Sequence, residues 1–241
     1  MEKNTPIILG IARPPGSSGK EQGGTGNTGS ASSVNKEKVP NELRQQVLKR
    51  DDNTCRHCGF KATKYQEILC LDGNPENHAE SNLATVCIFC HQCFNMDKVS
   101  QMRSGVLIWL PEIDQAKLHH IARAIYVARI SQGPMADAAR RALDAIMARR
   151  EEVKNRLSTD DPFILSTILR DYLGAKHYAA RDKKLEGVRL FPLDRRIIKE
   201  ADLEFNQFPQ ILAYWRSKDG PFGGKPPQEW THVYQKYAVA S

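Results

Sequence analysis

Two cysteine pairs carry the chemistry that this sequence most clearly supports. Cys55 pairs with Cys58 and Cys87 with Cys90, each pair has two residues between its cysteines, and about thirty residues separate the pairs. This spacing lets both thiolates of a pair reach one ion, and two such pairs complete the tetrahedral shell of Zn²⁺. Thiolates are soft ligands, which favour zinc over magnesium or calcium. Since four protein ligands leave no position for water or substrate, we expect one structural Zn²⁺ ion.

Other cysteines and histidines lie nearby, and simpler roles are expected for them. Cys70 belongs to an apolar run, and Cys93 follows three residues after the last paired cysteine, so both are expected as small buried thiols. His57 lies between the cysteines of the first pair and is expected to face solvent. A second metal site built from Cys70, His91 and Cys93 is the weaker alternative.

The overall composition is that of a globular protein. The 241 residues are 40% apolar, and the formal net charge of +7 favours an anionic partner. The basic residues are dispersed, so nucleic acid is a possible partner but not the favoured one. The sequence lacks both the run of about 18 apolar residues that a membrane span needs and the pattern of a signal peptide. We therefore expect no membrane span and a cytoplasmic location.

Changes in composition divide the chain into five segments. Residues 1–12 contain a short apolar run expected to form a strand, and residues 13–38, rich in Gly, Ser and Thr, are expected to form a flexible linker. Residues 39–104 hold the cysteines, and residues 105–213 show mainly helical periodicity. Residues 214–241 mix Pro and Gly with aromatic residues, which predicts an irregular tail.

Capping residues and apolar runs predict the elements that must position the cysteines. A helix capped by Asn41 is expected before the first pair, and β-prone runs at residues 105–111 and 188–192 predict short extended segments. Later helices are expected to begin near Asp114, Pro134, Asp161 and Asp194. The first of these should bury a face that includes Leu118, Ile121, Ile125 and Ala128.

Residues 47–98 resemble HNH nucleases. They retain an Arg-Asp before the first cysteine pair, an Asp-Gly-Asn, an Asn-Leu at Asn82, and a second pair followed by His91. In that family two adjacent residues, usually histidines, hold a divalent ion and activate water, but the matching positions here are Leu69 and Cys70. Leucine cannot bind a metal, and a thiol beside an apolar run does not replace imidazole as a base. The resemblance therefore implies a degenerate site with no catalytic residue.

A longer part of the chain resembles the DotN family, also called IcmJ. The segments "CRHCGFKATKYQEILCLDG", "SNLATVCIFCHQCF", "GVLIWLPE" and "VRLFP" carry this resemblance, which spans about residues 47–193. It implies a zinc-bound, HNH-like but non-nuclease adaptor in the coupling complex of a type IV secretion or conjugation system. The partners would be the DotL-like coupling ATPase and other coupling-complex subunits, at the cytoplasmic face of the inner membrane. The implied fold is α+β and mainly helical, with a small treble-clef ββα zinc module packed against a helical region.

Two alternatives stay open at this point. The first is an HNH-type, metal-dependent endonuclease or DNA-binding protein, supported by the basic charge and by the presence of both His91 and Asn82. The second is a redox-responsive zinc protein that uses Cys70 and Cys93.

Overall fold

The computed structural model describes residues 6–13, 39–200 and 202–230 of the chain. The sequence predicts a strand within residues 1–12. The structure describes this segment from residue 6 onward, and residues 6–13 contain no strand. This segment instead lies against the end of α2 and the start of α3, where Gly10 N donates to Cys93 O at 2.7 Å and Met96 N donates to Gly10 O at 3.1 Å. The expected linker, except for residue 13, lies outside the described residues.

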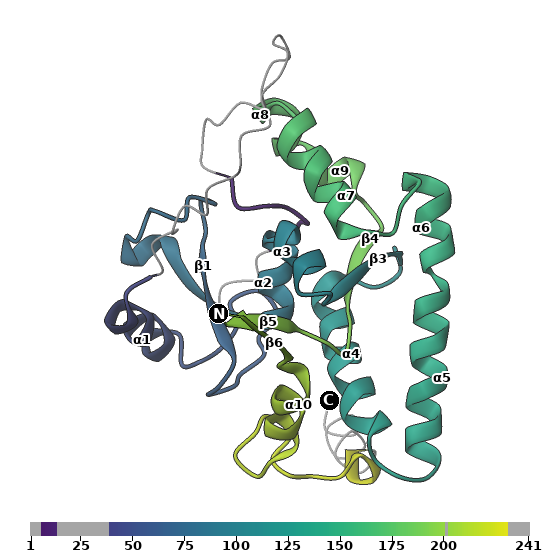
Figure 1. The fold of residues 1–241 in the computed structure, drawn as a ribbon. Coiled ribbons are helices and arrows are strands. Elements are labelled where there is room, and N and C mark those ends of the chain that lie inside the picture. The colour runs from purple at the N-terminus through teal and green to yellow at the C-terminus, as the bar shows by residue number, and fades with distance from the viewer. Residues whose placement is uncertain (1–5, 14–38, 201, 231–241) are drawn as a thin grey trace, which may run out of the picture.

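The described residues form a mixed α and β structure in which helix predominates (Figure 1). The helices are α1 (Asn41–Arg50), α2 (Ile88–Phe94), α3 (Met96–Gln101), α4 (Gln115–Arg129), α5 (Pro134–Ala148), α6 (Arg150–Leu157), α7 (Pro162–Thr167), α8 (Ala175–Ala179), α9 (Arg181–Lys184) and α10 (Phe208–Arg216). Shorter helical turns are η1 (Glu80–Asn82), the π-helical η2 (Ile168–Tyr172) and η3 (Pro227–Glu229). The strands are β1 (Gln66–Cys70), β2 (Leu83–Cys87), β3 (Gly105–Trp109), β4 (Val188–Pro192), β5 (Ile197–Glu200) and β6 (Leu203–Asn206).

The first sheet holds the second cysteine pair at its end. β1 and β2 are antiparallel, with Gln66 opposite Cys87 and Cys70 opposite Leu83. α2 begins at the residue after β2, so the chain forms a hairpin followed directly by a helix. All five residues of β2 are buried, which fits a strand covered on both faces.

A second sheet joins distant parts of the chain. β3 pairs antiparallel with β4, placing Gly105 opposite Pro192 and Trp109 opposite Val188. Both strands lie in the β-prone runs that the sequence indicates. Helix α4 packs along β4, and α5 and α6 form the long column opposite α1 in Figure 1.

Two of the expected helix caps are confirmed. The Asp114 carboxylate accepts from Lys117 N at 2.8 Å at the start of α4, and Asp161 accepts from Phe163 N at 2.8 Å at the start of α7. In α1, by contrast, Asn41 is the first helical residue and the cap position belongs to Pro40.

The prediction of a helix after Asp194 is wrong. Instead, β5 and β6 pair as antiparallel strands, and Asp194 forms an ion pair with Arg129 rather than capping a helix. Backbone bonds fix this hairpin, because Ile197 N donates to Met102 O and Gln207 N donates to Arg196 O. Residues 105–213 therefore contain four strands as well as helices, and the division of the chain into domains remains a prediction.

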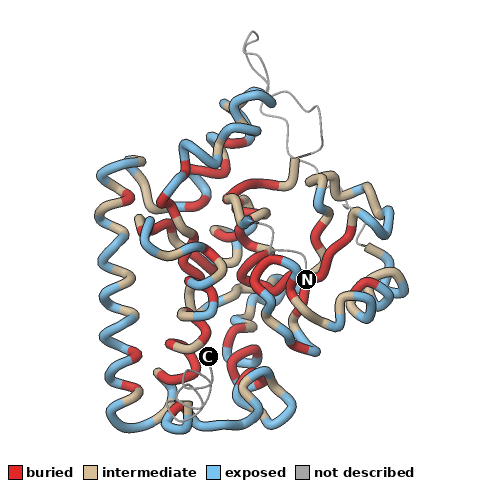
Figure 2. Tube along the Cα trace, turned by 180° about the vertical axis from the view of Figure 1, so that it is seen from behind, coloured by how far each residue is buried: buried red, intermediate tan, exposed pale blue. Residues whose placement is uncertain are grey.

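One core cluster contains the four paired cysteines together with residues from the far end of the sequence. Buried segments run through the interior of the molecule in Figure 2. Trp215, at the end of α10, is fully buried against Phe89, with ring centroids 5.6 Å apart. The irregular tail expected from residue 214 thus begins with the last three residues of α10, of which Tyr214 and Trp215 are buried in this core. Further along the tail, Trp230 stacks on Phe222, with ring centroids 5.2 Å apart, whereas residues 231–241 lie outside the described part.

None of the helices in the described part is both long enough and apolar enough to cross a lipid bilayer.

Candidate metal centre

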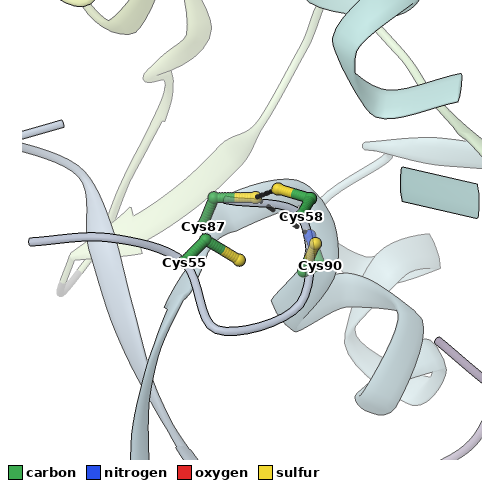
Figure 3. Close-up of side chains that lie close together, drawn as sticks. All are labelled: Cys55, Cys58, Cys87 and Cys90. Carbon is green, nitrogen blue, oxygen red and sulfur yellow. Dashed lines mark hydrogen bonds between the residues drawn. The ribbon is translucent and has the colours of Figure 1, made fainter. Parts of the chain in front are cut away.

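The structure brings the two cysteine pairs together. The first pair lies in the turn after α1, while Cys87 ends β2 and Cys90 lies in the first turn of α2. All four side chains are buried, and their sulfur atoms lie within 4.8 Å of one another (Figure 3). Among the described residues, this is the one group of three or more potential ligands close enough to share a metal ion.

The spacing of the sulfur atoms fits a metal better than a disulfide. The Sγ atoms of Cys58 and Cys87 are 3.6 Å apart. A tetrahedral Zn²⁺ site with Zn–S bonds of about 2.3 Å separates its sulfurs by about 3.8 Å, whereas a disulfide needs about 2.05 Å. All six cysteines are free thiols. The donor set and its dimensions therefore fit one zinc ion.

The first cysteine pair is held by a tight knuckle. Gly59 N donates to Cys55 O at 2.8 Å, and Cys55 N donates to Phe60 O at 2.9 Å. Gly59 has φ +71°, a left-handed conformation that glycine adopts without steric cost. This turn directs the Cys58 thiol back toward the second pair.

The Cys87 sulfur receives hydrogen bonds that favour the thiolate. It accepts from Cys90 N at 3.4 Å and lies 2.7 Å from Arg123 Nη2. Burial alone would raise the pKa of Cys87, but hydrogen bonds from the three neighbouring thiols and the charge of Arg123 lower it well below its ordinary value. Because a metal binds the thiolate form, the surroundings of Cys87 are prepared for metal binding.

Arg123 of α4 supplies the positive charge closest to the sulfurs. Its side chain is buried, 1% exposed, and its guanidinium lies over the ring of Phe60 at 3.9 Å and near Phe89 at 4.9 Å. Its Nε and Nη1 atoms have no hydrogen-bond partner among the described residues. A buried charge is costly unless it is paired, so the cluster of thiolates is the counter-charge that makes its position tolerable.

His119 contacts the other side of the cluster as a neutral donor. Backbone bonds to Leu190 fix the Gln115 amide, since its Nε2 donates to Leu190 O at 2.7 Å and its Oε1 accepts from Leu190 N at 3.0 Å. The same Nε2 donates to His119 Nε2 at 2.8 Å, which leaves the proton on Nδ1, 3.3 Å from Cys90 Sγ. Burial lowers the pKa of His119 to about 3, consistent with a neutral ring that donates to Cys90.

Sequence reasoning missed this supporting helix face. It assigned α4 an apolar face only, yet Gln115, His119 and Arg123 are all buried. These residues are spaced by four and run parallel to Leu118, Ala122 and Tyr126, so they share the buried side of the helix. Polar residues at this spacing beside an apolar stripe were the available signal.

The remaining cysteines and His57 lie outside the cluster. Cys93 is buried and its thiol donates to Phe89 O at 3.5 Å, while Cys70 is half-buried and its pKa is raised mainly by burial. The expectation that His57 faces solvent is wrong, because its ring is buried beside Phe94, with centroids 4.6 Å apart.

Three of the four positions expected to form a degenerate nuclease site line one cleft, and Asn82 is not among its lining residues. Leu69 and Cys70 of β1 and His91 of α2 line a common cleft of about 880 Å³. His91 is close to Asn95, with Nε2 and Nδ2 3.4 Å apart, and its pKa is lowered to about 4, mainly by burial.

Asn82 has a structural role in the loop before β2. Its side chain accepts from Asp72 N at 3.0 Å and donates to the Asp72 carboxylate at 3.0 Å and to Asn77 O at 2.9 Å. His78 belongs to the same loop, where its Nε2 lies 2.9 Å from Pro75 O.

The fold and this site define a mixed α/β protein with a buried four-cysteine metal centre. No family model matches the chain. It is 32% identical over 162 residues to the Type 4 apparatus protein DotN of Legionella pneumophila subsp. pneumophila strain Philadelphia 1. The alignment covers 66% of this chain and 75% of that protein. The chain therefore belongs to the DotN (IcmJ) family.

Proposed function

We propose that this protein is a non-catalytic, zinc-stabilised adaptor subunit of a type IV secretion or conjugation coupling complex. The observation that carries the proposal is the four-cysteine cluster beside Leu69 and Cys70. In a family member, this combination is expected if the fold was retained and hydrolysis was not. The name of its relative, a type 4 apparatus protein, supports the secretion role.

An HNH-like origin of the metal module is part of the proposal. The hairpin of β1 and β2 followed by α2 has the ββα order of that fold, and Cys87 and Cys90 lie at the junction of strand and helix. Leu69 and Cys70 occupy positions near the end of β1, where HNH enzymes carry their metal-binding and base residues.

The chemistry of these side chains supports a loss of catalysis. Leu69 offers no ligand atom, and Cys70, whose pKa is raised by burial, is a protonated thiol near neutral pH. His91 has no second imidazole to act with on β1, because that strand contains no histidine. A hydrolytic site needs both a metal ligand set and a base within reach of water, and neither is complete here.

The adaptor would bind the DotL-like coupling ATPase, together with other subunits, at the cytoplasmic face of the inner membrane. The centre's role would be to hold the fold rigid, because a four-thiolate site leaves no position for a reacting molecule. The bound ion would thus act on stability alone.

A nuclease assay tests the absence of catalysis. Purified full-length protein is incubated with supercoiled DNA and Mg²⁺, Mn²⁺ or Ni²⁺, beside a His91→Ala variant. We expect no cleavage above the no-protein control from either chain. Cleavage by the wild-type chain that His91→Ala abolishes would overturn the proposal in favour of the HNH enzyme.

Co-purification from the native host tests the adaptor role. We expect the coupling ATPase in the purified complex and about one zinc ion per chain by elemental analysis. Steeply salt-dependent duplex binding in the absence of that partner would instead favour a DNA-binding protein, since each neutralised phosphate releases condensed counterions.

A further inference from the structure

Exposed apolar side chains gather on one helical segment. In the described part of the chain, seven large apolar residues are well exposed, and four of them lie within α7 and η2. Single exposed apolar residues are common, but four within ten residues mark a surface that another molecule covers. We call these four the α7 stripe: Phe163 (48% exposed), Ile164 (45%), Ile168 (41%) and Tyr172 (67%).

The stripe lies on the side of the helix that faces away from the protein. The inner side, with Leu165, Ser166 and Leu169, is buried, and α7 packs there against α3. Ile164, Ile168 and Tyr172 follow one another at spacings of four, which aligns them along one outer face about 12 Å long. The segment is thus apolar on both sides, as is normal for a helix covered on both sides.

The charge around the outer end of the stripe is positive. Residues 168–185 include five basic residues and two acidic ones, a net charge of +3. Arg170, Lys176, Lys183 and Lys184 are exposed. Helices α7, α8 and α9 form an arm at the top of the molecule in Figure 1.

We infer that the α7 stripe is the docking surface for an amphipathic helix of another protein. The partner's apolar residues, spaced by three or four, would lie along the stripe, and acidic residues beside them would face the basic end. This inference rests on the proposed adaptor role, to which it assigns a surface.

Charge argues against a second copy of the chain on this surface. A parallel pair would bring two basic ends together. An antiparallel pair would oppose the basic end to Asp160 and Asp161, but Asp160 already pairs with Arg150, and Asp161 caps α7 and accepts from Ser100.

The proposed adaptor role favours a protein over a membrane as the occupant of this surface. Asp171 pairs with Arg170, whose Nε lies 3.2 Å from Asp171 Oδ1, so the basic end by itself would also suit anionic headgroups. The experiment below therefore counts a crosslink to lipid as evidence against the inference.

Site-specific photo-crosslinking in the native host tests the surface. Phe163→p-benzoylphenylalanine in the full chain places the probe in the stripe, and Leu203→p-benzoylphenylalanine is the matched control, because Leu203 is 74% exposed on β6. We expect a crosslink at position 163, at least tenfold above the control. Mass spectrometry should locate it in a net-acidic segment of another protein with apolar residues every three or four positions. A crosslink to lipid, to a second copy or to a peptide without that pattern, or a yield equal to the control, would overturn the inference.

A variant separates this inference from the adaptor role. Ile168→Asp should reduce recovery of the crosslinked partner at least tenfold. Because the residue is exposed, the melting temperature of this variant should match that of wild type. The control variant Leu203→Ser should leave recovery unchanged. If the crosslinked partner co-purifies equally well with Ile168→Asp, the assigned surface is wrong, while the adaptor role stands as long as the coupling ATPase is recovered with wild type. If no secretion subunit co-purifies with wild type, the adaptor role fails.

Discussion

At the scale of single residues, sequence spacing predicts the four cysteines of the metal centre, whereas the buried arginine beside them is found only from the packing of the structure. The four cysteines were predictable because a two-residue separation has a direct geometric meaning for a tetrahedral ion. Arg123 was not predictable in the same way, since a single arginine in a helix is normally assigned to solvent. Its burial follows from Phe60 and Phe89, which cover both its charge and its stem.

Arg123 should strengthen metal binding. Four thiolates and one Zn²⁺ carry a net charge of −2, and Arg123 is buried directly against Cys87. We expect Arg123→Met to weaken zinc affinity by about 10- to 100-fold, the usual effect of removing a partner of a metal ligand. Competition with a chromophoric chelator measures this affinity, and Arg123→Lys, which keeps the charge, should recover part of it.

Arg140→Met provides the matched control, because Arg140 is exposed on α5 and pairs only with Asp137 in the described part. Its zinc affinity should equal that of wild type. If Arg123→Met binds zinc as tightly as this control, the counter-charge assignment is incorrect.

At the scale of elements, local signals succeeded where a helix begins at a capping aspartate. Asp114 and Asp161 cap α4 and α7 as expected, because a carboxylate can satisfy the first free backbone donors without help from the rest of the fold. Asp194 has the same local signal, but Arg129, distant in sequence, pairs with it. The β5–β6 hairpin is held by backbone bonds to residues far away, which local periodicity does not report.

Helix α10 should contribute strongly to stability. Trp215 is fully buried and lies edge-on to Phe60, Phe89 and Phe208. We expect Trp215→Ala to lower the free energy of unfolding by about 3–5 kcal/mol, because it removes a large side chain and leaves a cavity. Urea denaturation measures the change. Leu203→Ala, at an exposed apolar position, should stay within about 0.5 kcal/mol of wild type, and an equally small effect of Trp215→Ala would contradict the placement of α10 in the core.

At the scale of the whole molecule, the metal centre and the helical region share one core. The sequence predicts a small zinc module followed by a separate helical region. The cysteine region and the helical region are not packed as separate units. Helix α4 supplies Arg123 and His119 to the cysteine cluster, and α10 adds Trp215 to the same core. Contacts between residues so far apart in sequence leave no trace in local patterns.

Removing the metal should therefore destabilise α4 and α10 as well as the cysteine region. Structural zinc contributes on the order of 10 kcal/mol in small sites, which is comparable to the total stability of a typical domain. We expect a strong chelator, or Cys87→Ser, to abolish the cooperative thermal transition. Hydrogen exchange should show lost amide protection in β2, α4 and α10 together, with Cys70→Ser, outside the cluster, behaving as wild type. Protection that is lost in residues 55–90 but retained in α4 and α10 would instead show that the helical region folds independently of the metal.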